Sequence, residues 1–181
     1  MLFTALDLFG AFIVAQERME DTRGFFARTF CRDEFAARGL CGDFVQSSTS
    51  FNARRGTLRG MHFQQAPHDE VKLVRCTSGA ILDVMIDMRP ASQTFRRWTA
   101  VELSAANGRS VYIPGGFAHG FQTLADGSEV LYQMTARYNS AAAAGVRWDD
   151  PAFGIHWPIE PPILSERDAT YPDFPREATK V

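Results

Sequence analysis

The most constraining feature of this chain is a series of short β-like segments between residues 71 and 136, each ended by turn-forming residues. The segments expected as strands are 71–77, 80–88, 98–103, 110–113, 118–124 and 129–136. Ser78-Gly79, Asn107-Gly108 and Asp126-Gly127 are typical turn sequences between such strands. A parallel α/β fold would need helical stretches of roughly 10–15 residues between strands, and this region contains none. The spacing therefore predicts an all-β fold, a sandwich or barrel.

Helices are expected mainly near the two ends of the chain. Residues 33–38 are compatible with one short helix, and Ser165 is the expected N-cap of another, with Asp168 at its third helical position. The simplest interpretation of Asp168 is an acid stabilised by the helix dipole. The alanine run 141–144 is expected to form a surface turn or a single helical turn.

Length, charge and cysteine content limit the possible classes of protein. The 181 residues favour a single domain spanning 1–181, and a net charge of −2 disfavours a nucleic-acid partner. Residues 1–15 are rather apolar but contain Asp7 and no basic segment before it, so neither a signal peptide nor a membrane span is expected. Cys31, Cys41 and Cys76 have no CxxC spacing, which favours a cytoplasmic protein without a disulfide framework.

Segment 59–72 concentrates more ionisable side chains than any other stretch. His62 lies between the apolar residues Met61 and Phe63, which indicates an imidazole on a strand. Arg59, His62 and Lys72 in one pocket would suit an anionic substrate that must give up a proton. The plainer alternative is that His62 is a hydrogen-bonded core histidine.

A metal site is a second alternative for the same segment. His62, His68, Glu70 and His119 could supply a three-histidine or two-histidine, one-carboxylate ligand set. However, six residues of strand would separate His62 from His68 by about 20 Å, so only a turn at Pro67 could bring them together. The glycines flanking His119, at 116 and 120, would allow close approach of a backbone or a ligand.

Lys72 and Tyr132 lie inside apolar runs. A lysine in such a run either reaches solvent at a sheet edge or serves a site, because burial of an unpaired ammonium group is costly. Tyr132 is most simply a core tyrosine whose hydroxyl is hydrogen-bonded.

Five motifs in order along the chain resemble the dTDP-4-dehydrorhamnose 3,5-epimerase family. They are Arg59-Gly60-Met61-His62-Phe63-Gln64, Lys72-Leu73-Val74-Arg75, Pro114-Gly115-Gly116-Phe117-Ala118-His119-Gly120-Phe121, Leu131-Tyr132 and Trp148-Asp149-Asp150-Pro151. Segments 21–26 and 164–168 are also similar to that family, so the resemblance covers about residues 12–170. Each motif alone is weak, but five in register are specific.

The resemblance implies a cupin-type jelly roll of antiparallel strands, with short helices near the termini, that works as a homodimer without a metal or other cofactor. The implied activity is epimerisation of a nucleotide-linked 4-keto-6-deoxy hexose in deoxysugar biosynthesis. The implied roles are His62 as general base, Asp168 as its partner, Tyr132 as the acid on the opposite face and Lys72 as the group beside the keto oxygen. The implied substrate contacts are Arg23, Phe26, Arg28, Gln46, Arg59, His119, Tyr138 and Arg167. His68 and Glu70 then become loop residues without a role.

These residue types suit the implied chemistry. A hydrogen next to a ketone becomes acidic when the developing enolate oxygen is stabilised, and a lysine ammonium group can do this. A carboxylate fixes the tautomer of the histidine that takes the proton. Inversion needs a second acid, because return of the proton from His62 would restore the original configuration.

The chain departs from the family pattern around the substrate. Arg28 and Ala144 stand where glutamates are common, Ser47-Ser48 replaces an Asp-Asn pair, and Gln133 and Arg167 replace lysines. The resemblance therefore leaves open the nucleotide, the sugar, and whether C3, C5 or both are inverted. Two other functions also stay open: a single-carbon epimerase or ketoisomerase, and a non-catalytic metal-binding or sugar-binding cupin.

Overall fold

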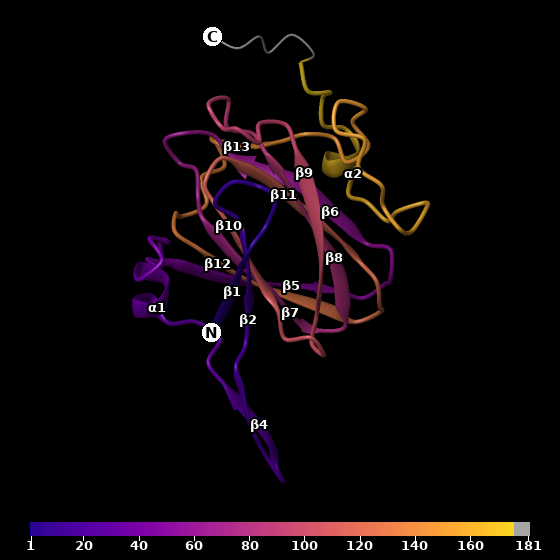
Figure 1. The fold of residues 1–181 in the computed structure, drawn as a ribbon. Helices are drawn as coiled ribbons and strands as arrows, with labels where there is room; N and C mark the ends of the chain where they lie inside the picture. Colours follow the sequence, from indigo (N-terminus) through magenta and orange to yellow (C-terminus); the bar gives the residue numbers. More distant parts are fainter. Residues whose placement is uncertain (176–181) are drawn as a thin grey trace.

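The computed structural model describes residues 1–175, which form two facing antiparallel sheets (Figure 1). Residues 176–181, the end of the predicted 1–181 domain, lie outside the described part. The first sheet has six strands in the spatial order β1 (Leu2–Ala5), β2 (Phe12–Ala15), β10 (Ser110–Ile113), β7 (Lys72–Ser78), β12 (Ser128–Met134) and β5 (Gln46–Asn52).

The second sheet has five strands and covers one face of the first. Its spatial order is β13 (Ala143–Gly145), β6 (Leu58–Gln64), β11 (Phe117–Thr123), β8 (Ala80–Asp87) and β9 (Trp98–Ser104). Strands β3 (Arg18–Asp21) and β4 (Gly24–Ala27) form a separate hairpin that projects away from both sheets (Figure 1).

The predicted all-β fold of antiparallel strands is confirmed. All six strands expected between residues 71 and 136 are present, with ends shifted by only a few residues. Gly108 and Gly127 have φ angles of +62° and +63°, the left-handed conformation that their predicted turns require. The expectation for the alanine run was wrong in part: residues 141–142 form a turn, but Ala143 and Ala144 belong to β13 and pair with Gln64 and Phe63 of β6.

The strand periodicity divides the apolar residues among three clusters. Side chains that point between the sheets, such as Val74, Ile81 and Phe121, form the central core. The alternate residues of β8, Val84 and Ile86, pack on the outer face of the five-stranded sheet beneath the segment after β13. A third cluster packs on the six-stranded sheet beside α1 (Arg32–Ala36), a helix that overlaps the predicted 33–38.

The second helix, α2 (Glu166–Ala169), begins as predicted. The Asp168 amide donates to Ser165 Oγ over 3.1 Å, so Ser165 is the N-cap and Asp168 the third helical residue. In the described part of the chain, neither helix is long and apolar enough to cross a membrane.

Candidate active site

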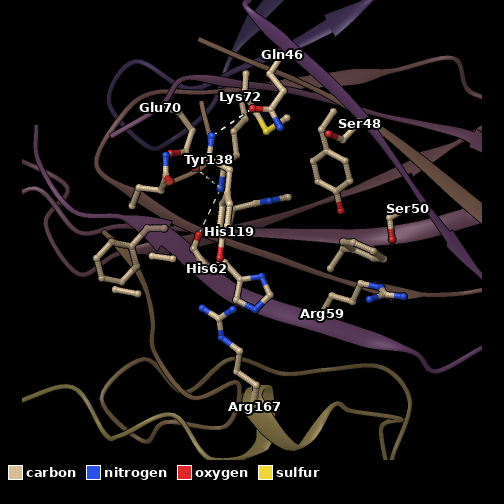
Figure 2. A pocket seen from close by; sticks show the side chains of 17 residues that line it. Gln46, Ser48, Ser50, Arg59, His62, Glu70, Lys72, His119, Tyr138 and Arg167 are labelled. Carbon is tan, nitrogen blue, oxygen red and sulfur yellow. Dashed lines mark hydrogen bonds and ion pairs between the residues drawn. The ribbon is translucent and has the colours of Figure 1, made fainter. Parts of the chain in front are cut away.

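A cavity of about 450 Å³ opens between the two sheets, and most of the predicted catalytic residues line it (Figure 2). The six-stranded sheet contributes Lys72 and Tyr132, and the five-stranded sheet contributes His62 and His119. Lys72, Tyr132 and Gln46 share one face of their sheet because Met134 pairs with both Lys72 and Gln46, and Tyr132 lies two residues before it. Strand register thus brings together residues distant in sequence.

His62, which lines the cavity, forms a close polar pair with Asp168. His62 Nε2 lies 2.6 Å from Asp168 Oδ1, and the side chains are 43% and 7% exposed. Burial alone would raise the pKa of Asp168, but bonds from His62, the Gly60 amide and Ser165 outweigh it and lower the pKa below its usual value. The carboxylate therefore accepts a hydrogen from Nε2, and Nδ1 remains as the ring nitrogen that can take a proton.

The cap of α2 explains how Asp168 reaches the histidine. Its backbone amide is held by Ser165 Oγ, while its side chain points to β6 rather than back to its own helix. The interpretation of Asp168 as a simple helix-start acid is therefore incomplete, because the carboxylate also connects α2 to His62.

His119 pairs with Asp83, a residue outside the motifs that pointed to the site. His119 Nε2 lies 2.8 Å from Asp83 Oδ2, and the side chains are 4% and 0% exposed. Asp83 points inward from β8 beside Phe121 of β11, and its Oδ1 has no partner among the described residues. An acid within the apolar run 81–86 was the signal for such a buried pair.

The glycine beside His119 has a structural reason. A Cβ atom on Gly120 would lie 2.8 Å from the Arg59 oxygen and 3.0 Å from the Gly60 Cα. The backbone of β6 therefore lies against Gly120, which is the close backbone approach expected next to His119. In this pairing of β6 with β11, His119 lies directly opposite His62.

Lys72 is buried, and its partner is Glu70. Lys72 Nζ lies 3.1 Å from Glu70 Oε1 and 3.4 Å from the His62 backbone oxygen. Glu70 Oε2 accepts a hydrogen bond of 2.6 Å from Gln64 Nε2. Glu70 lies in a loop, as predicted, but its exclusion from the candidate site was wrong, because its side chain lines the cavity.

Tyr132 lines the cavity beside His119 and Phe121. Its ring centroid is 6.1 Å from that of His119, in an edge-to-face arrangement. Burial, together with the charge of Asp83, raises the pKa of Tyr132 above its usual value despite the opposing effect of Arg59. The phenol is therefore protonated at neutral pH and can donate a proton.

Four of the predicted substrate contacts also line the cavity: Gln46, Arg59, Tyr138 and Arg167. Arg59 Nε donates to Asn52 Oδ1 over 2.7 Å, which leaves the outer guanidinium nitrogens for a ligand. Gln46 Oε1 accepts from the Tyr138 amide over 3.2 Å. Arg167 extends from α2 toward the cavity, on the side of His62 (Figure 2).

Arg23, Phe26 and Arg28 do not line this cavity. Arg23 and Phe26 lie on the projecting hairpin, where Arg23 pairs with Asp21 over 2.5 Å. Arg28 pairs with Glu34 of α1 over 2.9 Å. Within the described chain, these three predicted substrate contacts therefore lie away from the other nine predicted site residues. Eight of those nine line the cavity, and the ninth, Asp168, is bonded to His62.

The departures from the family pattern divide between the cavity and its surroundings. Ser48, Ala144 and Arg167 line the cavity. Gln133 pairs with Leu73 of β7 and Ser47 of β5, and its side chain lies on the face of β12 that points away from the cavity. Only the cavity-lining departures can contact a ligand there directly.

The four residues of the metal alternative are not assembled into one ligand set. His62 binds Asp168, Glu70 binds Lys72, His119 binds Asp83, and His68 Nε2 lies 3.1 Å from Asn139 Nδ2. Across residues 1–175, no three His, Cys, Asp or Glu side chains are arranged to hold a metal ion.

A cavity with a histidine on one sheet, paired with an aspartate of α2, and a lysine and a protonated tyrosine on the other sheet defines an acid–base enzyme built on an antiparallel sandwich. Comparison with known proteins then gives the family. The chain belongs to the dTDP-4-dehydrorhamnose 3,5-epimerase family, whose model matches residues 5–176. This places it among the isomerases, as the sequence resemblance predicted.

Three relatives show how far the similarity extends. A dTDP-4-dehydrorhamnose 3,5-epimerase from Sinorhizobium fredii is 40% identical over 96% of this chain and 90% of its own length. A crystal structure of such an enzyme from Bacillus anthracis, with TDP and PPi bound, has a TM-score of 0.93 at 36% identity and covers 96% of this chain and 99% of its own. A 3'-monoepimerase from Streptomyces bikiniensis, in complex with dTDP-quinovose, has a TM-score of 0.86 at 33% identity and covers 93% and 85%. The cupin-type jelly roll is thereby confirmed.

Proposed function

We propose that this chain epimerises a nucleotide-linked 4-keto-6-deoxy hexose at C3, C5 or both, in deoxysugar biosynthesis. The observation that carries the proposal is the pairing of His62 with Asp168 in a cavity that Lys72 and Tyr132 face from the opposite sheet. A sugar ring between the sheets would meet a base on one face and an acid on the other.

The reaction begins at a carbon next to the C4 ketone. His62 Nδ1 takes the proton, and the electron pair of the broken C–H bond moves to the ketone oxygen, which becomes an enolate. The Lys72 ammonium group stabilises the developing negative charge. Asp168 stabilises the imidazolium and holds its tautomer.

Inversion follows when Tyr132 gives its phenolic proton to the same carbon from the opposite face, and the electron pair returns from oxygen to carbon. Exchange with water then removes the proton from His62 and restores that of Tyr132. Positioned acids and bases typically contribute about 10²–10⁴-fold each.

The proposed substrate is a nucleotide-diphospho keto sugar. Arg59 and Arg167 place positive charge at the cavity, which suits a diphosphate. His119 has only Nδ1 left for a ligand, because Nε2 is bonded to Asp83. Gln46 is a proposed contact near the nucleoside, and Tyr138, whose amide donates to Gln46 Oε1, is a further proposed substrate contact. The similarity to a 3'-monoepimerase favours inversion at C3 alone as the second candidate.

The test is incubation of the protein with dTDP-, CDP-, UDP- and GDP-linked 4-keto-6-deoxy hexoses in D₂O, followed by NMR. The expected result is deuterium at C3, C5 or both on at least one of them, and the product configuration identifies the inverted carbon. Absence of deuterium from every substrate would contradict the proposal.

We further propose that the chain, as one domain, works as a homodimer in which each hairpin completes the partner's site. Arg23 and Phe26 lie outside their own cavity, on a hairpin that leaves the sandwich (Figure 1). Met19 and Phe26 on this hairpin are 63% and 69% exposed. Apolar side chains grouped on a projecting segment are typical of a surface that another chain covers.

Co-expression of two inactive variants tests this arrangement. Arg23→Ala lacks the hairpin contact, and His62→Ala lacks the base. In a mixed dimer, the cavity of the Arg23→Ala subunit still has His62 and receives the intact hairpin of the His62→Ala subunit. Random pairing should restore about a quarter of the wild-type activity at low substrate concentration. No recovery in demonstrated mixed dimers would show that Arg23 serves its own chain, and a monomeric wild-type protein would contradict the dimer.

We propose a cytoplasmic location for the enzyme. The described residues include three free cysteines, Cys31, Cys41 and Cys76, and an unpaired set of this kind suits a reducing compartment. Fractionation of the native host would test the location, and recovery of the protein outside the cytoplasm would contradict it.

A further inference from the structure

The structure points to Glu70 as a further residue of the site. Lys72 and Glu70 form an ion pair beside the cavity (Figure 2). Their side chains are 10% and 8% exposed, so both ends of the pair are largely removed from water. A buried ammonium group needs a compensating charge and hydrogen-bond acceptors, and it is destabilising without them. Glu70 supplies the charge next to Lys72 over 3.1 Å.

Both carboxylate oxygens of Glu70 are occupied. Oε1 faces Lys72, and Oε2 accepts from Gln64 Nε2 over 2.6 Å. Gln64 is itself held in place: its Nε2 also donates to the His68 backbone oxygen over 2.9 Å, and its Oε1 accepts from the Asn139 amide over 2.6 Å. The carboxylate is therefore fixed by β6 and two loops rather than free to follow the lysine.

Two of the three ammonium hydrogens of Lys72 are directed to acceptors on the protein, Glu70 Oε1 and the His62 backbone oxygen. One donor remains for the cavity that all three residues line. Lysine has a flexible four-carbon chain, so without a fixed partner its ammonium group would spread over several rotamers.

We infer that Glu70 is a positioning residue: it holds the Lys72 ammonium group so that its free donor meets the C4 oxygen where the enolate charge develops. This inference rests on the proposed epimerase function. It assigns Glu70 no contact with the substrate and no proton transfer, and it requires that the effect of Glu70 pass through Lys72.

Glu70→Gln is the sharpest variant because it keeps the size of the side chain. An amide offers only one acceptor oxygen, so its NH₂ group must face either Lys72 Nζ or Gln64 Nε2, both of which are donors. Removal of an oxyanion donor typically lowers kcat by about 10²–10³-fold. Misplacement of a donor should cost less, so we expect Glu70→Gln to lower kcat about tenfold or more, with KM within about threefold. Glu102→Gln, at an exposed position of β9, is the matched control and should keep wild-type kcat.

A double-mutant cycle shows whether the effect passes through Lys72. In a Lys72→Ala background, Glu70→Gln should change the residual rate of deuterium exchange less than about twofold. An equal loss in both backgrounds would overturn the inference, as would full kcat for Glu70→Gln. If Glu70→Gln fails to fold, judged by circular dichroism, Glu70→Asp enters the same cycle. A wild-type protein without exchange activity would contradict the proposed function instead, so the two failures are distinguishable.

Discussion

His62 and Tyr132 face one cavity from opposite sheets of the sandwich. His62 is fixed by Asp168 of α2, and Tyr132 packs edge-on against His119, the residue opposite His62 in its sheet. In the proposed mechanism, this relationship separates the group that takes a proton from the group that returns one. Removal of each group should therefore have a different effect.

Tyr132→Phe should separate proton exchange from inversion. His62 can still remove the substrate proton and return deuterium to the same face, so exchange in D₂O should continue. Inversion should fall by about 10²-fold or more, because the opposite face lacks an acid. NMR of the recovered sugar measures both quantities in one sample. An equal loss of exchange and inversion would contradict the division of roles.

Asp168→Asn should lower kcat by about 10²-fold or more while the fold is kept. An asparagine can present its NH₂ group to His62 Nε2, which favours the wrong tautomer and leaves the imidazolium unpaired. Steady-state kinetics would measure the loss. Glu166→Gln in the same helical turn is the control and should retain the wild-type rate. Similar kinetics for the two variants would argue against the His62–Asp168 pair.

Gly120→Ala should destabilise the protein more than Gly127→Ala. The added methyl group at 120 would meet the backbone of β6, whereas at 127 it would meet open space and cost about 1 kcal/mol from the positive φ alone. Urea unfolding at a fixed protein concentration would give both free energies. Equal losses would show that the close approach of β6 and β11 contributes little stability.

Asp87 should make stability depend on pH. Burial opposes ionisation, but bonds from Arg89, Ser92 and Thr94 outweigh it and lower the pKa of Asp87 from 3.8 to about 2. The folded-state pKa lies below the unfolded one, so the stabilisation is present above pH 3.8 and is lost as pH falls toward 2. Asp87→Asn should therefore lower the free energy of unfolding by about 2 kcal/mol at pH 7 and by less at pH 3.

Urea unfolding of wild type and Asp87→Asn at both pH values measures this difference. Asp7→Asn, at an exposed position, serves as the control for the loss of one carboxylate. A difference between wild type and Asp87→Asn that is the same at pH 7 and pH 3 would contradict the assigned shift.

Local sequence signals predicted the strands and the α2 cap because those features depend on neighbouring residues. Turn pairs such as Asp126-Gly127 mark where strands end, and Ser165 marks where a helix begins. The short strand at Ala143 was missed because alanine has little strand preference. It forms a strand because β6 offers a partner, and that partner is distant in sequence.

The site residues were predicted unevenly for the same reason. His62 and Lys72 stood out as ionisable groups in apolar runs, but nothing local connected either one to a partner. Asp168 lies 106 positions after His62 and reaches it only through the packing of α2 on β6. Glu70, two residues before Lys72, could have been assigned only by knowing which way its loop turns.

The central claim is that His62 is the base that takes the substrate proton, and deuterium incorporation tests it most directly. Wild type, His62→Ala and His156→Ala are incubated in D₂O with the keto sugar that the wild type accepts, and NMR follows C3 and C5. His156 is exposed and does not line the cavity, so its variant is the control. The account predicts wild-type incorporation for His156→Ala and a loss of about 10²-fold or more for His62→Ala. Wild-type incorporation in a folded His62→Ala protein would contradict the account.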